Sequence, residues 1–251
     1  MPLPKIDLPL FEVKIVSLLK PVKFRPFLVK EEKLLLMALQ SEDEQTILNT
    51  VKQVINNCLI EQVDIDTIPI FDLEYLFLNI RARSVGEIAE SAYVCRNVVG
   101  VEQNEEDEEV EVQCKHLMNI KINLLEIQPP ISNIATKLYF TKDVGIQLMF
   151  PTLETYKSVK NLILSEDPEQ VYEFIFDCTE YVFDQDTVYY KNESTLEEFK
   201  QFLESLTQEQ FDRILDFFKN LPSIKKEINH KCEKCGFDHN LVLEGLNDFF
   251  T

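Results

Sequence analysis

The chain has 251 residues, of which 45% are apolar, and its 44 acidic and 25 basic residues give a formal net charge of −19. This acidity disfavours nucleic-acid binding, because such binding depends on lysine and arginine displacing counterions from phosphate. No apolar stretch reaches the roughly 20 residues of a membrane-spanning helix, and residues 1–7 do not resemble a secretory leader. We therefore expect a folded protein made in a reducing cytosol, without nucleic-acid or membrane partners.

The first part of the chain, residues 1–87, combines a hairpin pattern with helical patterns. Residues 10–29 predict a β-hairpin, because apolar and polar residues alternate on both sides of a turn. Ser41 and Glu44 have the spacing of a capping box at the start of a helix. Apolar residues at helical spacing predict three helices, over residues 30–39, 42–59 and 71–82.

Residues 88–128 are predicted to be extended, and they contain two cysteines, Cys95 and Cys114. Between the cysteines, seven of the ten residues 102–111 are acidic, and the run is unbroken from Glu105 to Glu109. Blocks of like charge repel one another, so this run predicts a solvated loop tip. The alternative interpretation is a docking site for a basic partner.

Residues 129–222 predict a hairpin, over residues 137–150, followed by helices. The predicted helices cover residues 152–164, 168–184, 195–205 and 207–220. Two capping-box pairs mark the starts of the last two: Thr195 with Glu198, and Thr207 with Gln210.

Residues 223–251 contain the sharpest motif of the chain, Cys232-Glu-Lys-Cys235-Gly236. Two cysteines at this spacing can face one zinc ion at about 2.3 Å, and the glycine supplies the backbone freedom that the tight turn needs. The residues that follow alternate as in a strand. This pattern differs from a redox-active motif, which stands at the start of a helix.

A structural zinc site needs four ligands, and one such motif supplies two. Cys95 and Cys114 offer the other pair, because the residues around them resemble the strand, turn and strand around Cys232 and Cys235. The sequence therefore predicts an α+β fold with an N-terminal hairpin, helical segments and one structural Zn²⁺. The ion would lie in a zinc ribbon assembled from two sequence-distant β-hairpin knuckles, residues 88–128 and 223–251, with residues 129–222 inserted between them.

Other assignments of the thiols stay open at this point. One of the nearby histidines, His116, His230 or His239, is an alternative ligand in place of a cysteine. A metal-free or redox-active motif is a further alternative. Cys58 and Cys178 stand among apolar residues of predicted helices, and we expect both in the core.

The usual catalytic patterns are missing from the sequence. It contains no GxGxxG, phosphate-binding loop, GxSxG or HExxH motif, and its three histidines all lie beside the cysteines. A zinc ion held by four thiolates has no open position at which to activate water. We therefore expect a protein that is not an enzyme.

Three stretches of the chain carry a family resemblance. They are Leu8-Pro…Phe24-Arg-Pro-Phe-Leu-Val-Lys-Glu-Glu-Lys-Leu-Leu-Leu, Phe71-Asp-Leu-Glu-Tyr-Leu-Phe-Leu-Asn-Ile-Arg-Ala-Arg-Ser-Val-Gly-Glu, and the closing Cys-x-x-Cys-Gly…Leu-Glu-Gly-Leu-Asn-Asp-Phe-Phe. These stretches resemble the T4-like bacteriophage baseplate family. The resemblance implies a baseplate hub subunit or hub assembly protein, located in the tail baseplate of the virion and made in the host cytoplasm. It implies other baseplate or tail proteins as partners, with self-association as a further alternative.

Two groups of residues within these stretches have both a structural and an interface interpretation. Phe24, Arg25 and Phe27 fit the edge of a core and, alternatively, a docking site. Arg81 and Arg83 stand near the predicted end of a helix, where basic side chains interact favourably with the helix dipole. Alternatively, they belong to an interface with another protein.

Two other functions compete with the structural one. A nucleic-acid-binding zinc ribbon would use a basic face, for which the sequence offers Lys225, Lys226, Lys231 and Lys234. A thiol oxidoreductase would use the two cysteines of the CxxC motif.

Overall fold

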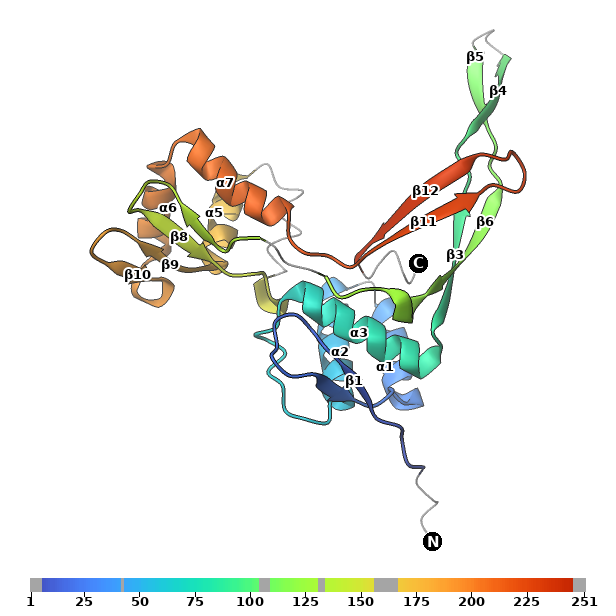
Figure 1. The fold of residues 1–251 in the computed structure, drawn as a ribbon, viewed down its shortest axis with the longest axis horizontal. Helices are drawn as coiled ribbons and strands as arrows, with labels where there is room; N and C mark the ends of the chain where they lie inside the picture. Colours follow the sequence, from blue (N-terminus) through green and yellow to red (C-terminus); the bar gives the residue numbers. More distant parts are fainter. Residues whose placement is uncertain (1–5, 42, 104–108, 131–133, 156–166, 246–251) are drawn as a thin grey trace.

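The computed structural model describes residues 6–41, 43–103, 109–130, 134–155 and 167–245. It is a mixed α+β protein with small antiparallel sheets, and its outline is elongated (Figure 1). Helices of the N-terminal part occupy the middle, a lobe of sheet and helices forms one end, and long hairpins form the other. The α+β class predicted from the sequence is confirmed, whereas the predicted domain boundaries stay a prediction.

The N-terminal part contains the predicted hairpin and three helices. Strands β1 (Phe11–Val13) and β2 (Val22–Phe24) pair antiparallel. The three helices are α1 (Val29–Gln40), α2 (Glu44–Cys58) and α3 (Ile70–Val85).

The predicted capping box at Ser41 and Glu44 is wrong. Asp43 is the N-cap of α2, and its carboxylate accepts the N–H of Thr46 at 2.9 Å. Ser41 instead ends the preceding helix, because its hydroxyl donates to the carbonyl of Ala38 at 2.6 Å. An aspartate is as good an N-cap as a serine, so the sequence pattern alone did not decide between the two.

The largest hydrophobic core forms around α3 and ties this part to the hairpins. Most residues in the first four turns of α3 are buried. One of them, Asp72, accepts hydrogen bonds from the backbone N–H groups of Val16 and Ser17. Apolar residues of the hairpins reach the same core, including Ile120, Ile122, Leu124, Ile224 and Leu243.

The hairpin end of the molecule is built from three two-stranded sheets. Strand β3 (Ile88–Val94) pairs with β6 (Leu117–Asn123), and β11 (Lys225–Lys231) pairs with β12 (Asp238–Glu244). A short 3-10 helix, η1 (Leu124–Glu126), follows β6. Between β3 and β6, strands β4 (Val98–Gln103) and β5 (Glu109–Gln113) form a narrow ribbon that projects from the body (Figure 1). The extended conformation predicted for residues 88–128 is thus confirmed for the strands of the described part, whereas residues 124–126 form the 3-10 helix η1.

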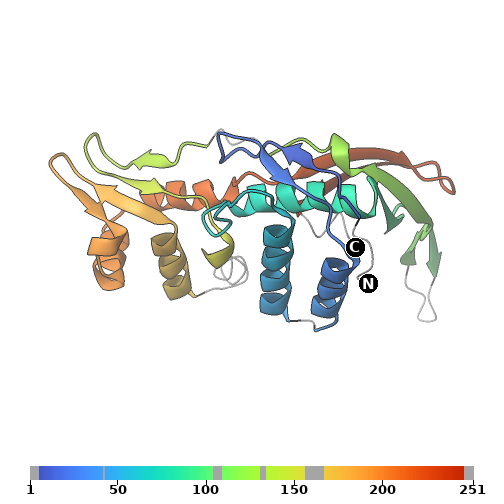
Figure 2. The same cartoon turned by 90° about the horizontal axis from the view of Figure 1, so that it is seen from below.

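The other end is a four-stranded antiparallel sheet in the order β10-β9-β8-β7. Figure 2 shows helices on one side of this sheet, and the side chains between them form a second hydrophobic cluster. The strands are β7 (Lys137–Tyr139), β8 (Gly145–Leu148), β9 (Thr179–Phe183) and β10 (Val188–Tyr190), followed by the 3-10 helix η2 (Lys191–Glu193). The helices are α5 (Pro168–Asp177), α6 (Leu196–Glu204) and α7 (Gln208–Lys219).

One predicted helix in this lobe is too long. The helix predicted over residues 168–184 ends at Asp177, and the chain continues as β9. The sequence Thr179-Glu-Tyr-Val-Phe183 is rich in β-branched and aromatic residues, which favour a strand that can pair with β8. The helices predicted over residues 195–205 and 207–220 and their two capping boxes are confirmed, whereas most of the helix predicted over 152–164 lies outside the described residues.

Candidate metal centre

Four cysteine sulfurs meet where the two long hairpins lie against each other. The sulfurs of Cys95, Cys114, Cys232 and Cys235 all lie within 4.8 Å of one another. Cys95 and Cys235 approach to 3.6 Å, and Cys114 and Cys232 approach to 3.9 Å. All four are free thiols, and three of them are buried. The structure therefore brings together the two pairs that the sequence singled out, across 118 and 140 residues of chain.

The spacing of the sulfurs fits one tetrahedral zinc ion. With four Zn–S bonds of about 2.3 Å, a regular tetrahedron places neighbouring sulfurs about 3.8 Å apart. The Cys95–Cys235 and Cys114–Cys232 distances, 3.6 and 3.9 Å, lie on either side of that value. A disulfide would need a separation of about 2.05 Å, so these distances are typical of shared metal ligands and not of a bond.

The two halves of the cluster repeat the same backbone hydrogen bonds. Cys95 N–H donates to His116 O at 2.8 Å, and Cys232 N–H donates to Phe237 O at 2.9 Å. The residue after the second cysteine of each pair closes the turn. The N–H of Lys115 donates to Cys95 O, and the N–H of Gly236 donates to Cys232 O, both at 2.9 Å.

These two closing residues share a left-handed backbone conformation. Gly236 has φ +73°, and Lys115 has φ +53°, the only described non-glycine residue with positive φ. Each half is therefore a knuckle of one design, with the β4–β5 ribbon inserted between Cys95 and Cys114 in the first. Sequence comparison of the two halves found the repeat, but it did not anticipate that Lys115 would adopt the conformation of the glycine.

Further polar groups contact the sulfurs from outside the cluster. His239 places Nε2 3.1 Å from the sulfur of Cys95, and Asn97 Nδ2 lies 3.7 Å from the sulfur of Cys235. The ammonium of Lys234 donates to the carbonyl of Cys114 at 3.2 Å. Within the described residues the set of mutually close ligand atoms contains four cysteines and no histidine. We therefore assign His239, one of the alternative ligands that the sequence left open, as a neighbour of the four cysteine ligands.

The thiols of the cluster differ in acidity. Burial raises the pKa of Cys95 to about 12, and burial also raises the pKa of Cys114. The N–H of Phe237, which faces the sulfur of Cys235, lowers the pKa of that thiol to about 6. Closely packed thiols do not all ionise without a cation among them, so a bound metal would release protons as it enters.

The candidate interface residues around Arg25 are mostly buried. Phe24 and Phe27 are 1% and 8% exposed. The guanidinium of Arg25 donates from Nη1 to the carbonyl of Pro26 at 2.8 Å and from Nη2 to the carboxylate of Glu31 at 3.0 Å. These contacts agree with the core interpretation of Phe24, Arg25 and Phe27.

Arg81 and Arg83 lie in the last turns of α3. Arg81 Nη1 donates to the carbonyl of Gly86 at 3.3 Å. The guanidinium of Arg83 lies 4.8 Å from the ring centroid of Phe11, so it contacts the N-terminal hairpin. Both contacts fit the structural interpretation, and use of these arginines as an interface stays a prediction.

Two of the four lysines near the cysteine cluster are paired with carboxylates. Lys225 pairs with Glu244 at 3.0 Å, and Lys226 pairs with Glu126 at 3.5 Å. Their charges are therefore partly neutralised. This arrangement gives no specific support to nucleic-acid binding.

The remaining two cysteines lie apart from the cluster. Cys58 and Cys178 are 0% and 1% exposed, as the sequence predicted. Burial raises the pKa of Cys58 to about 11 and that of Cys178 to about 12. Both are core thiols with low reactivity.

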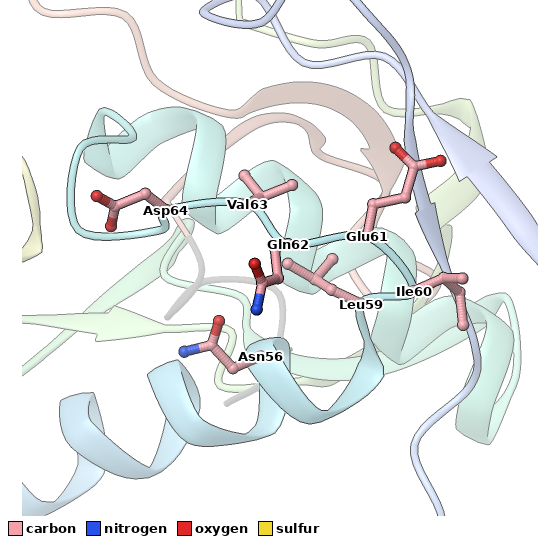
Figure 3. Close-up of a pocket in the computed structure, with 7 residues that line it drawn as sticks. All are labelled: Asn56, Leu59, Ile60, Glu61, Gln62, Val63 and Asp64. Atoms are coloured by element: carbon pink, nitrogen blue, oxygen red, sulfur yellow. The ribbon is translucent and has the colours of Figure 1, made fainter.

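A hollow of about 490 Å³ lies beside the end of α2, lined by Asn56 and residues 59–64 (Figure 3). The carboxylates of Glu61 and Asp64 point away from each other in this view. The lining residues include no histidine or cysteine. The hollow therefore presents no convergent acid–base pair.

The comparisons with known proteins give one match. The family model described as T4 bacteriophage base plate protein matches residues 8–251, nearly the whole chain. No curated protein and no solved structure matches significantly. Among the described residues, the helices are too short or too polar to cross a membrane.

Proposed function

Because the chain belongs to the T4 bacteriophage base plate protein family, we propose that it is a structural or assembly component of a contractile-tail phage baseplate, in the hub region. The family match over residues 8–251 is the observation that carries this proposal. Under this proposal the protein acts in the virion tail, and its partners are other baseplate or tail proteins. Synthesis in the host bacterial cytoplasm belongs to the same proposal.

The protein acts through contact with its partners and not through catalysis. Its cysteine cluster presents four sulfurs to one point, which leaves a zinc ion no open position for substrate or water. An elongated chain with hairpins at one end also offers a large surface for assembly. These features suit a component that is held in place by its neighbours.

One structural Zn²⁺ bound by Cys95, Cys114, Cys232 and Cys235 fixes the two long hairpins to each other. The sulfur spacing supports this assignment. Each pair of cysteines belongs to a different hairpin, so the ion crosslinks chain segments that are far apart in sequence. Loss of either pair should therefore loosen both hairpins.

Metal analysis of the purified chain tests the zinc assignment. We expect one zinc per chain in the wild type and loss of most of that zinc in Cys95→Ser and in Cys232→Ser. Cys178→Ser is the matched control, since it replaces an equally buried cysteine outside the cluster. Full zinc content in either cluster variant would contradict shared coordination.

Quantitative mass spectrometry of purified tails tests the place of action. A permanent subunit should be present at a fixed number of copies relative to known tail proteins. An assembly factor should be present in intermediates from infected cells and missing from finished tails. A chain found in neither fraction would refute the proposed function.

A further inference from the structure

The β4–β5 ribbon has no structural partner among the described residues. The two strands pair only with each other, so both of their outer edges carry unpaired N–H and C=O groups. All six residues of β4 and four of the five residues of β5 are exposed. An isolated two-stranded ribbon is marginally stable in water, and a third strand is the usual way to stabilise it.

The two faces of the ribbon are unusual for a solvated hairpin, because each combines apolar and acidic residues. Val101 lies opposite Glu111 on one face, and Glu102 lies opposite Val110 on the other. Val101 is 57% exposed and Val110 is 48% exposed. Valine favours the strand conformation, and at this exposure it also presents apolar surface that a third strand would cover.

Strand β5 alternates strictly between the two residue types. Val110 and Val112 point to one face, and Glu109 and Glu111 point to the other. A partner strand that alternates apolar and basic residues would place its apolar side chains against the valines and its cations against the carboxylates. Such a partner matches the free edge in backbone hydrogen bonding, packing and charge.

The charge of the ribbon also restricts the partner. Residues 98–113 contain seven acidic residues and no lysine or arginine. Two ribbons of this charge repel, which disfavours pairing with a second copy of the chain. A basic strand from another protein is favoured instead.

The position of the ribbon is fixed by the cysteine knuckle at its base. Cys114 directly follows Gln113 of β5, and its N–H donates to the carbonyl of Asn97 at 2.8 Å. This hydrogen bond continues the ladder from the ribbon into the knuckle. The edge is therefore held in register before a partner arrives, which lowers the entropy lost on binding.

We propose that the free edge of β5 is a docking edge, which binds an extended segment of another protein with alternating apolar and Lys/Arg residues as a third strand. The binding edge is inferred from the exposed ribbon alone. The proposed function adds that the partner is another baseplate or tail protein. Main-chain hydrogen bonds provide the affinity in this kind of recognition, and alternate side chains provide the specificity.

A labelled octapeptide of alternating valine and lysine tests the proposal on the purified full chain. We expect weak binding by fluorescence anisotropy, with a Kd on the order of 100 µM at low salt, and slower amide exchange in residues 109–113. A peptide with glutamate in place of lysine should not bind. A peptide with N-methylated bonds on its pairing edge should also fail, since it lacks the necessary N–H groups.

Two variants separate the docking edge from the general acidity of the chain. Val110→Ser leaves the charge unchanged and should weaken binding about fivefold, because Val110 is exposed in the free ribbon and loses apolar contact with the partner strand when it is replaced. Val188→Ser is the matched control, as Val188 is 42% exposed and lies on the edge strand β10. It should leave the Kd unchanged.

A third variant removes the ribbon but keeps the knuckle. Replacing residues 96–113 by Glu-Lys joins Cys95 and Cys114 by two residues, which is the spacing between Cys232 and Cys235. This variant should keep its far-UV circular dichroism and metal content and lose peptide binding.

Equal peptide binding by wild type, Val110→Ser and the shortened variant would overturn the proposal. The acidic residues of the ribbon would then have the role of keeping the edges of β4 and β5 from pairing with other strands. Absence of the chain from tails and assembly intermediates would refute the proposed function alone, because the peptide experiment does not depend on it.

Discussion

The buried ion pair between Glu31 and Arg25 allows a quantitative test of the N-terminal core. The side chain of Glu31 has no exposed surface, and that of Arg25 is 15% exposed. One carboxylate oxygen accepts Arg25 Nη2 at 3.0 Å, and the other accepts the N–H of Leu28 at 2.8 Å. Glu31→Gln removes the charge and keeps one acceptor oxygen, so the guanidinium stays buried without its counter-ion.

Breaking a buried ion pair by removing one partner costs roughly 3–5 kcal/mol. Because the amide oxygen preserves one of the two hydrogen bonds, we expect the lower end of this range, about 3 kcal/mol of unfolding free energy. Glu32→Gln is the matched control, since it makes the same change at an exposed position in the same helical turn. It should change stability by less than about 0.5 kcal/mol.

Urea unfolding measures the free energy of unfolding of both variants. Far-UV circular dichroism supplies the signal, because the chain contains no tryptophan for fluorescence. Amide exchange in α1 then shows whether the loss is local to this core. A Glu31→Gln protein as stable as Glu32→Gln would refute the argument.

The pH dependence of the same pair has a defined sign. Burial by itself raises the pKa of Glu31, but the N–H of Leu28 and the guanidinium of Arg25 outweigh it and lower the pKa below its usual value of 4.5. Glu31 therefore contributes stability above pH 4.5, and this contribution is lost as the pH falls through the lowered pKa. The difference between wild type and Glu31→Gln should be constant near neutrality and shrink in acid.

Three further predictions concern single sites. Gly145→Ala should destabilise the lobe by about 2 kcal/mol in urea unfolding, because the new Cβ would collide with a carbonyl of the neighbouring strand and with a phenylalanine ring; unchanged stability would contradict this packing. Lys115→Gly should stabilise the knuckle by about 0.5 kcal/mol, since glycine adopts positive φ without strain, and Gly236→Lys should destabilise it; the reverse order would contradict the assigned geometry. Cys58 and Cys178 should resist iodoacetamide at pH 8 until the chain unfolds, because burial raises both pKa values, and rapid labelling of the native protein would count against their burial.

Patterns local in sequence predicted most of the helices and hairpins. The CxxC motif and its weaker repeat at Cys95 and Cys114 predicted the cluster, because metal ligands restrict both residue type and spacing. The capping boxes at Thr195 and Thr207 located two helix starts for a similar reason. The capping requirement lies within a few residues of chain, whereas the four metal ligands are recognised by residue type and spacing although they lie up to 140 residues apart.

Pairings between distant segments were predicted only where the residue type itself indicates a shared ligand, as it does for the four cysteines. The helix predicted over residues 168–184 includes β9, because the strand preference of residues 179–183 is short and local and becomes decisive only through pairing with β8 and β10. His239 was one of three histidines that the sequence placed near the cysteines, but the sequence did not show which of them approaches Cys95.

X-ray absorption at the zinc edge of the purified chain tests the central claim most directly, because it reports the ligands around the ion. One ion shared by Cys95, Cys114, Cys232 and Cys235 predicts four sulfur neighbours at about 2.3 Å. A first shell with two sulfurs and two nitrogen or oxygen neighbours would contradict the account, since the two hairpins would then not share their ligands.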